Sequence, residues 1–220
     1  YFYPDIPKGY QISQYKYPLV EGGTIAGVAI TRVHLEEDTA RSLHDQNEGS
    51  IIDYNRAGVP LMELVTEPDI HDAKQAVLFA KELQLLLRTV GASDANMEKG
   101  EMRVEANISV SKDDTLGTKV EVKNLNSFKV VESAIDYEIA RQIADLEKGI
   151  PVRQETRGWD EAKNRTFTQR YKESSDDYRY FPDPDLPSLD ISKIEEFNIS
   201  RLESEMPELP EKKRLKYSNL

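Results

Sequence analysis

The sequence contains no cysteine, which excludes disulfides, thiolate zinc sites and cysteine nucleophiles within its 220 residues. No stretch approaches the ~20 consecutive apolar residues that a membrane-spanning helix needs, so we expect no membrane association. The first residues have neither the basic start nor the apolar run of a secretory signal. They also lack an initiator methionine, and we therefore expect a piece of a longer chain.

The sequence contains fewer basic than acidic residues. Lysine and arginine number 29 against 40 aspartates and glutamates, which gives a net charge of −11. Such a surface disfavours non-specific binding of nucleic acid, although a local basic patch can still hold an RNA end. With 38% hydrophobic and 31% charged residues, the composition is that of a globular protein.

Two common catalytic patterns are also missing. The sequence has no glycine-rich phosphate loop of the Walker or dinucleotide type. Its three histidines, His34, His44 and His71, show no metal-ligand spacing, and none is adjacent to a serine suited to a triad. A serine hydrolase or a zinc enzyme therefore has no support.

The hydrophobic pattern predicts strands early in the chain and helices between hairpins later. Strands are expected over residues 28–35, where Val33 and Leu35 face one way and His34 the other, and over residues 60–65. The later pattern predicts helices and hairpins, in this order: a helix over 73–90, a hairpin over 103–123, a helix over 128–148 and a hairpin over 152–172. This order predicts an α+β fold, a mainly antiparallel sheet with covering helices.

Capping residues mark the ends of the two helices. Asp69 or Asp72 can cap the first helix, Asn126 or Ser127 can cap the second, and Gly149 ends it. We therefore expect both helix starts to be fixed by side chains.

A change of composition near residue 190 predicts a domain boundary. The proline-rich segment 183–187 is expected to be a rigid crossing loop. The chain then becomes helical and highly charged, with interruptions at Pro207 and Pro210. We predict one domain over 1–190, followed over 191–220 by a linker and the first helix of the next domain.

Acidic residues collect at two strand ends. Glu36, Glu37 and Asp38 follow the first strand, and Glu63 stands among apolar residues of the second. Carboxylates from two strands suit a hard cation such as Mg²⁺, and a carboxylate in an apolar strand is costly unless it is paired or coordinated. The alternative is a solvated acidic turn.

The hairpin over 103–123 has one polar face. Glu105 and Glu121 could hold a cation or orient a nucleotide, and the cationic residues Arg103, Lys119 and Lys123 could meet phosphate oxygens. Cross-strand ion pairs on a wet sheet face are the alternative.

The segment 152–172 is locally basic and contains interleaved aromatic residues. Arg157, Arg165 and Arg170 lie in it, together with Phe167. This mixture suits nucleotide phosphates and an unstacked RNA end, so these arginines are our candidate tRNA contacts. An ordinary pair of strands is the alternative.

Six strings in order resemble the GatB family of the aspartyl/glutamyl-tRNA amidotransferases. They are YFYPDIPKGYQISQ (1–14), RVHLEED (32–38), DYNRAGVPLME (53–63), KNLNSF (123–128), QETR (154–157) and DYRYFPDPDLP (177–187). The family's string Arg-Cys-Asp-Ala-Asn appears here with Glu105 in place of Asp, which puts a role for that carboxylate in doubt.

The resemblance implies a glutamine-dependent ligase with a glutamine-synthetase-like catalytic domain. In this family the side chain of Glu-tRNA(Gln) or Asp-tRNA(Asn) is phosphorylated with Mg-ATP and then amidated. The ammonia comes from the amidase GatA, and the small protein GatC completes a heterotrimeric complex. The resemblance also implies a location in the bacterial cytoplasm or an organellar matrix.

By position, the resemblance assigns roles to individual residues. Glu37 and Glu63 match Mg²⁺ ligands, and Glu121 matches an acid of the active site, beside which Arg103 and Lys123 could stabilise phosphoryl charge. Weaker candidates for contacts with ATP are Lys8, Tyr10, Lys119 and Arg179.

Two rival functions remain open at this stage. One is a non-catalytic protein of the same complex that docks tRNA through the 152–172 segment. The other is a divalent-metal hydrolase that uses the acidic cluster.

Overall fold

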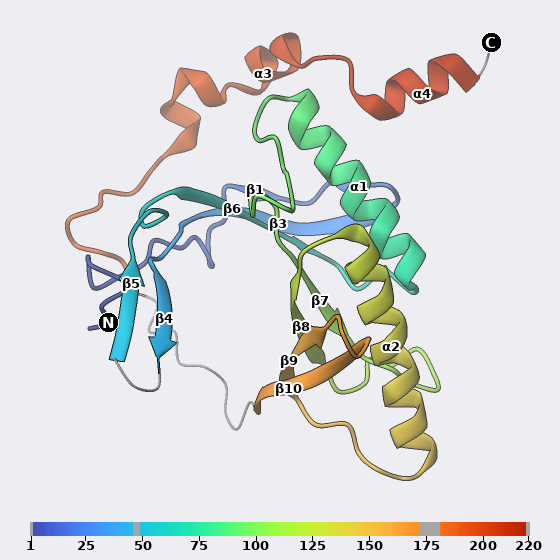
Figure 1. Cartoon of the computed structure of the whole chain (residues 1–220). Helices are drawn as coiled ribbons and strands as arrows, with labels where there is room; N and C mark the ends of the chain where they lie inside the picture. The colour runs from blue at the N-terminus through green and yellow to red at the C-terminus, as the bar shows by residue number, and fades with distance from the viewer. Residues whose placement is uncertain (1, 46–48, 172–180, 219–220) are drawn as a thin grey trace. The chain divides into compact units, whose positions relative to one another are not determined.

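The computed structural model describes residues 2–45, 49–171 and 181–218 (Figure 1). The chain forms two compact units, Tyr1–His71 (unit 1) and Asp72–Leu220 (unit 2). The boundary between the two units therefore lies after His71. The domain boundary expected near residue 190 stays a prediction. The α+β class is confirmed, with mostly antiparallel sheets and a few helices. The glutamine-synthetase likeness remains a prediction.

Unit 1 is built around one long strand. Strand β3 pairs antiparallel with β1, β2 and β6, and β4 and β5 form a separate hairpin. The predicted strands over 28–35 and 60–65 are confirmed as β3 and β6. The strands of unit 1 are β1 (Val20–Glu21), β2 (Thr24–Ile25), β3 (Val28–Glu37), β4 (Arg41–Asp45), β5 (Gly49–Asp53) and β6 (Pro60–Thr66).

Burial near the end of β3 is inverted at two neighbouring residues, although Val28 and Ile30 at its start are buried as expected. His34 is 3% exposed, whereas Leu35 is 39% exposed. The register pairs His34 with Glu63 and Leu35 with Met62, so the two faces are divided as the sequence predicted. Burying a polar side chain costs free energy unless it is paired, and exposing an apolar one gains none. The reversal of the usual burial at His34 and Leu35 therefore indicates a functional site.

Unit 2 contains a four-stranded sheet in the order β10-β9-β8-β7. The pairs β7–β8 and β9–β10 are antiparallel, which confirms both hairpins, but β8 and β9 run parallel. Helix α2 lies between these two strands in the chain and makes the crossover that a parallel pair requires. The bounds are α1 (Ala73–Thr89), β7 (Val104–Ile108), β8 (Val120–Leu125), α2 (Phe128–Glu147), β9 (Glu155–Asp160) and β10 (Arg165–Tyr171).

Both predicted helix starts are confirmed. The Asp72 carboxylate accepts a hydrogen bond from the backbone N–H of Gln75, and the Ser127 hydroxyl accepts one from that of Val130. After α2, Gly149 has φ +73°, the left-handed conformation in which glycine ends a helix.

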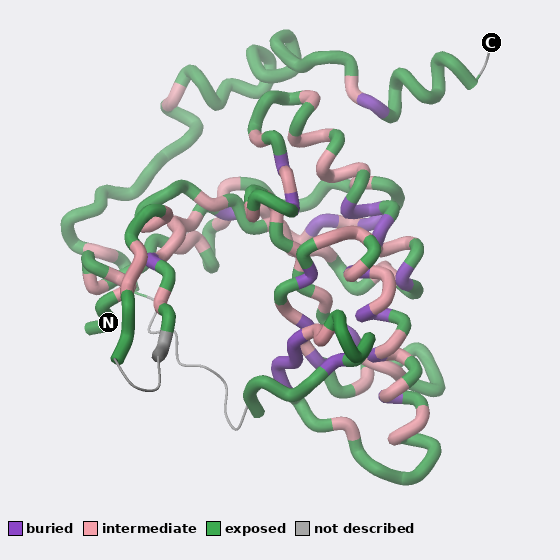
Figure 2. The backbone as a smooth tube through the Cα atoms, viewed as in Figure 1, coloured by how far each residue is buried: buried purple, intermediate pink, exposed green. Residues whose placement is uncertain are grey.

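The core of unit 2 lies between the two helices and one sheet face. Buried segments follow α1, α2 and the strands they cover (Figure 2). In β8, Val122 and Leu125 both point into this core although they are three residues apart. Asn124 has φ +62° and the pairing with β7 shifts nearby, so a bulge turns Leu125 inward.

A buried polar network joins α2 to β9 and β10. The carboxylate of Glu138, fully buried, accepts hydrogen bonds from Arg141 (3.1 Å), Gln142 (3.0 Å) and Thr166 (2.9 Å). Its Oε2 also lies 3.4 Å from Nε of Arg157. The buried carboxylate of Glu138 therefore joins α2 to β9 and β10, and it is shielded from solvent.

Residues 191–218 form a helical tail, as predicted. Its last helix contacts α1, where Arg214 pairs with Glu82. The tail contains η1 (Ile191–Lys193), η2 (Glu195–Phe197), α3 (Ile199–Glu205) and α4 (Pro210–Ser218). Among the described residues, no helix combines the length and apolar character that a membrane span requires.

Candidate functional site

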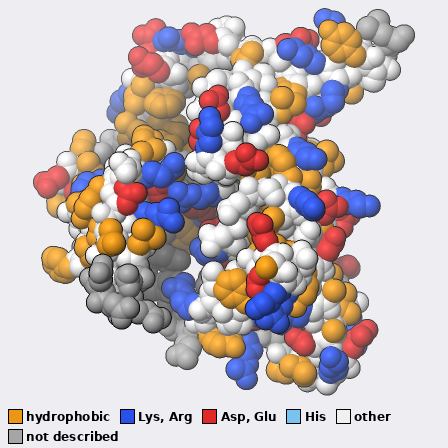
Figure 3. Space-filling view, viewed as in Figure 1, with side chains coloured by type: hydrophobic (Ala, Val, Ile, Leu, Met, Phe, Trp, Pro, Cys, Tyr) orange, Lys and Arg blue, Asp and Glu red, His pale blue; other side chains and the backbone are white. Residues whose placement is uncertain are grey.

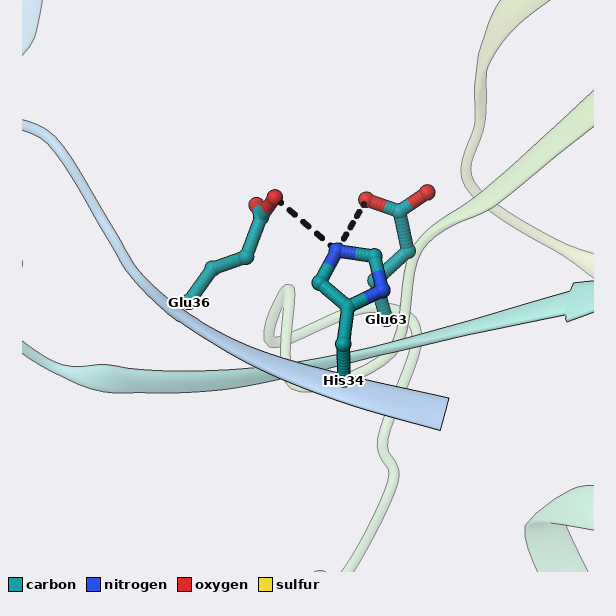
Figure 4. A group of neighbouring side chains, drawn as sticks. All are labelled: His34, Glu36 and Glu63. Carbon is teal, nitrogen blue, oxygen red and sulfur yellow. Dashed lines mark hydrogen bonds and ion pairs between the residues drawn. The ribbon is translucent and has the colours of Figure 1, made fainter. Parts of the chain in front are cut away.

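Three side chains converge on unit 1 where β3 pairs with β6. Nε2 of His34 lies 3.1 Å from Oε1 of Glu36 and 3.6 Å from Oε2 of Glu63 (Figure 4). One ligand atom from each residue falls within 4.8 Å of the other two. The imidazole is buried, but the Glu63 side chain is 50% exposed, so the cluster is open on one side. We call these three residues the His34 cluster.

The His34 cluster follows directly from strand geometry. His34 and Glu36 are two apart on β3 and therefore share a face. Glu63 stands opposite His34 on β6, and cross-strand neighbours point to the same side. His34 was not among the predicted metal ligands, because the three histidines show no metal-ligand spacing among themselves. The signal was a His-X-Glu alternation facing a carboxylate on a second strand.

Glu37 lies on the other face of β3. It pairs with Pro60 across the strands, and its carboxylate forms an ion pair with Lys8. The ammonium of Lys8 lies 4.8 Å from the ring centroid of Tyr10. Glu36, rather than Glu37, thus lies with Glu63 in the His34 cluster, and the assignment of Glu37 to Mg²⁺ stays a prediction from resemblance.

A small pocket lies beside Glu37. Its volume is about 150 Å³. Lys8, a predicted ATP contact, lines it, whereas Tyr10 does not. The other lining residues are Asp5, Ile6, Pro7, Gln11, Glu37, Asp38, Thr39, Ala57 and Gly58.

The polar sheet face of unit 2 brings several predicted site residues together. Nζ of Lys123 lies 3.2 Å from Oε2 of Glu105 and 3.5 Å from Oε1 of Glu121. The Thr156 hydroxyl donates to Oε2 of Glu121 over 3.0 Å. Glu121 is therefore held by β9 as well as by its own strand, and it presents an oriented carboxylate on the face opposite the core.

Lys123 keeps its proton in this setting. Partial burial alone would lower the pKa of Lys123, but the charges and hydrogen bonds of Glu105 and Glu121 outweigh that effect and raise the pKa above its ordinary value. A lysine held cationic beside two carboxylates is suited to contact an anion such as a phosphate.

We expect the stabilisation from this ion-pair group to disappear only in alkaline solution. Because the folded-state pKa of Lys123 is raised, the contribution is fully present below the unfolded-state pKa and is lost as pH rises through the folded-state value. Replacing Lys123 with Met should lower the free energy of unfolding at neutral pH, by an amount that shrinks at strongly alkaline pH. Urea unfolding beside the exposed control Lys119→Met measures this, and a pH-independent difference would contradict it.

The remaining cationic candidates lie in different settings. Arg103, Lys119, Arg165 and Arg170 are exposed, in keeping with contacts to a ligand. On the face shown in Figure 3, basic side chains lie among acidic ones rather than in one continuous patch. Arg179 is outside the described residues.

Arg157 is turned into the protein. Its guanidinium bonds to Glu155 (2.7 Å), Thr166 (2.8 Å) and Thr168 (3.0 Å), and the side chain is only 10% exposed. The pairing of Arg157 with Val122 places it on the core face of β9, where RNA has no access to it. Its role as a direct tRNA contact is thus not supported by the geometry, and the prediction rests on Arg165 and Arg170.

Comparisons with known proteins match almost the whole chain. The family model described as the GatB/GatE catalytic domain covers residues 1–195. The protein of Gloeothece citriformis named as the B subunit of aspartyl/glutamyl-tRNA(Asn/Gln) amidotransferase is 46% identical, over 99% of this chain and 48% of that protein. The protein of the same name in Thermodesulfovibrio yellowstonii is 48% identical over 97% of this chain and 46% of its own length. The chain thus spans about half the length of the curated relatives it matches.

Proposed function

This chain belongs to the family of the GatB/GatE catalytic domain, and we propose that it activates the side-chain carboxylate of Glu-tRNA(Gln) or Asp-tRNA(Asn) with ATP. A carboxylate oxygen bonds to the γ-phosphorus while the bond to ADP breaks. Ammonia then forms the C–N bond, phosphate leaves, and the product is the amide. In this proposal the amidase GatA supplies ammonia from glutamine, and the small protein GatC completes the complex.

The convergence of His34, Glu36 and Glu63 carries this proposal. Two carboxylates fit Mg²⁺, which prefers oxygen ligands and usually keeps positions for phosphate oxygens and water. Carboxylate oxygens also suit Mn²⁺, so we expect the His34 cluster to accept either ion. A cation there would neutralise negative charge on the phosphates.

The chain's own residues supply positioning and charge. The buried ring of His34 lies beside the carboxylates of both strands, with its Nε2 3.1 Å from Glu36 and 3.6 Å from Glu63. In unit 2, Lys123 stays cationic and Thr156 orients Glu121. Phosphoryl transfer depends on such positioning and electrostatic stabilisation more than on a covalent nucleophile, and no nucleophilic cysteine exists in the chain.

The test is ATP turnover by the complete complex. We expect release of phosphate from labelled ATP to require Mg²⁺ and charged tRNA, and amide formation to require glutamine in addition. Uncharged tRNA is the matched control, because it offers the same RNA without the carboxylate. Turnover that is independent of the aminoacyl group would reject carboxylate activation and favour a simple metal-dependent hydrolase.

The same assay addresses the scaffold alternative. If the chain only docked tRNA, substitutions at Arg165 and Arg170 would weaken tRNA binding, while substitutions in the His34 cluster would leave turnover unchanged. The burial of Arg157 removes one of the three arginines on which that alternative was based.

A further inference from the structure

An aromatic ring lies on the polar face of the unit 2 sheet, where the proposed function has given it no role. Phe167 of β10 is 42% exposed and pairs with Gly158 of β9. Its strand neighbours Thr166 and Thr168 turn to the other face, where they bond to Glu138 and Arg157. The ring therefore points away from the core and onto the face that carries Glu121 and Lys123.

Gly158 shapes the position of this ring. A Cβ atom at Gly158 would lie 2.7 Å from Cζ and 2.9 Å from Cε1 of Phe167, and 2.6 Å from Nε2 of Gln169. The end of the ring thus lies against bare backbone, in space that any other residue would fill. A glycine inside a strand often marks such a close approach, and here it holds an exposed aromatic ring on the sheet.

Charged groups lie at a defined spacing from the ring. The register places Phe167, Gly158 and Lys123 in one row across β10, β9 and β8. Two strand spacings separate the first from the last, roughly 10 Å. Arg170 stands opposite Thr156 in the next row, and the Glu121 carboxylate accepts the Thr156 hydroxyl hydrogen bond. The ring of Phe167 and the cationic residue Lys123 are thus set apart by two strand spacings on one face of the sheet.

We propose that Phe167 stacks on the adenine ring of ATP, with the phosphates directed toward Lys123. This rests on the proposed function and names the residue that holds the base. Aromatic rings bind bases through their faces, and Lys123, held cationic beside Glu105 and Glu121, can contact a phosphate. The distance of two strand spacings between Phe167 and Lys123 leaves room for one base and its phosphates, which favours a single nucleotide over an RNA strand.

The experiment compares ligands with and without the base in the complete complex. Phe167→Ala should weaken ATP binding by about five- to 100-fold, as expected for the loss of one stacked base. Binding of inorganic triphosphate, which has no base, should be unchanged. We expect the KM for ATP to rise with kcat nearly constant, because the lost contact is the same in ground and transition states.

Three variants serve as controls. Phe167→Tyr retains a stacking surface and should restore ATP affinity. Gly158→Ala should weaken ATP binding like Phe167→Ala, because its Cβ displaces the ring. Phe197→Ala removes a phenylalanine of similar exposure, 39%, from η2 and should change nothing.

Each contrary result has a definite meaning. Unchanged ATP affinity in Phe167→Ala, or an equal loss for triphosphate, would overturn the assignment. A variant that binds tRNA more weakly but binds ATP normally would also overturn the assignment, because Phe167 would then stack on a base of the RNA. These results differ from failure of the proposed function, in which the wild-type complex itself shows no turnover that depends on charged tRNA.

Discussion

Replacing Glu63 with Gln is expected to lower ATP turnover that depends on charged tRNA by about a hundredfold or more. The substitution keeps the size of the side chain but removes one of the two carboxylates that contact His34. Because Glu63 is half-exposed and not part of the core, the complex should still assemble. Phosphate release under saturating ATP measures the effect, and size-exclusion chromatography checks assembly.

The matched control is Glu67→Gln. This carboxylate lies just after the same strand, where it accepts a hydrogen bond from Thr31, but it is outside the His34 cluster. Its turnover should remain close to that of the wild type. Normal turnover in Glu63→Gln would remove the cluster from the mechanism, and equal losses in both variants would indicate a general effect of acidic residues.

A metal-binding measurement separates the two neighbouring glutamates. Titration with Mn²⁺, followed by electron paramagnetic resonance, should show weaker binding in Glu36→Gln by at least about tenfold, because even the loss of an outer-shell partner costs that much. Glu37→Gln should keep its affinity, because its side chain lies on the opposite face of β3 with Lys8. The reverse result would support the family-based assignment of Glu37 and contradict the geometric one.

Removing the buried carboxylate of Glu138 is expected to cause a large loss of stability. Glu138→Ala would leave Arg157 with Glu155 as its carboxylate partner. It would also remove the acceptor for Thr166 and the buried partner of Arg141. Breaking a buried ion pair on one side typically costs about 3–5 kcal/mol. Thermal and urea unfolding of the full-length protein measure the change.

Asp136→Ala is the control for this prediction, because Asp136 is an exposed acid on the same helix. It should alter the free energy of unfolding by no more than about 0.5 kcal/mol. A similarly small change in Glu138→Ala would show that water or neighbouring groups replace the carboxylate. The network would then have no special role in joining α2 to β9 and β10.

Local patterns allowed much of the fold to be predicted. Alternation gave the two hairpins of unit 2, and capping chemistry gave the starts of α1 and α2 at Asp72 and Ser127. Each of these features depends on residues that lie within a few positions of one another. The parallel pairing of β8 with β9 was missed, because nothing local distinguishes a parallel neighbour from an antiparallel one. The β4–β5 hairpin was missed as well.

The sequence by itself determined the absence of thiol chemistry, the α+β class, the helix ends and the resemblance to one family. Only the tertiary structure decided which of two adjacent glutamates approaches Glu63, and that Arg157 faces the core. The reason is that side chains alternate along a strand, so a shift of one residue in pairing reverses every assignment of a face. The register between β3 and β6 depends on contacts between distant parts of the chain, and therefore it becomes visible only in the fold.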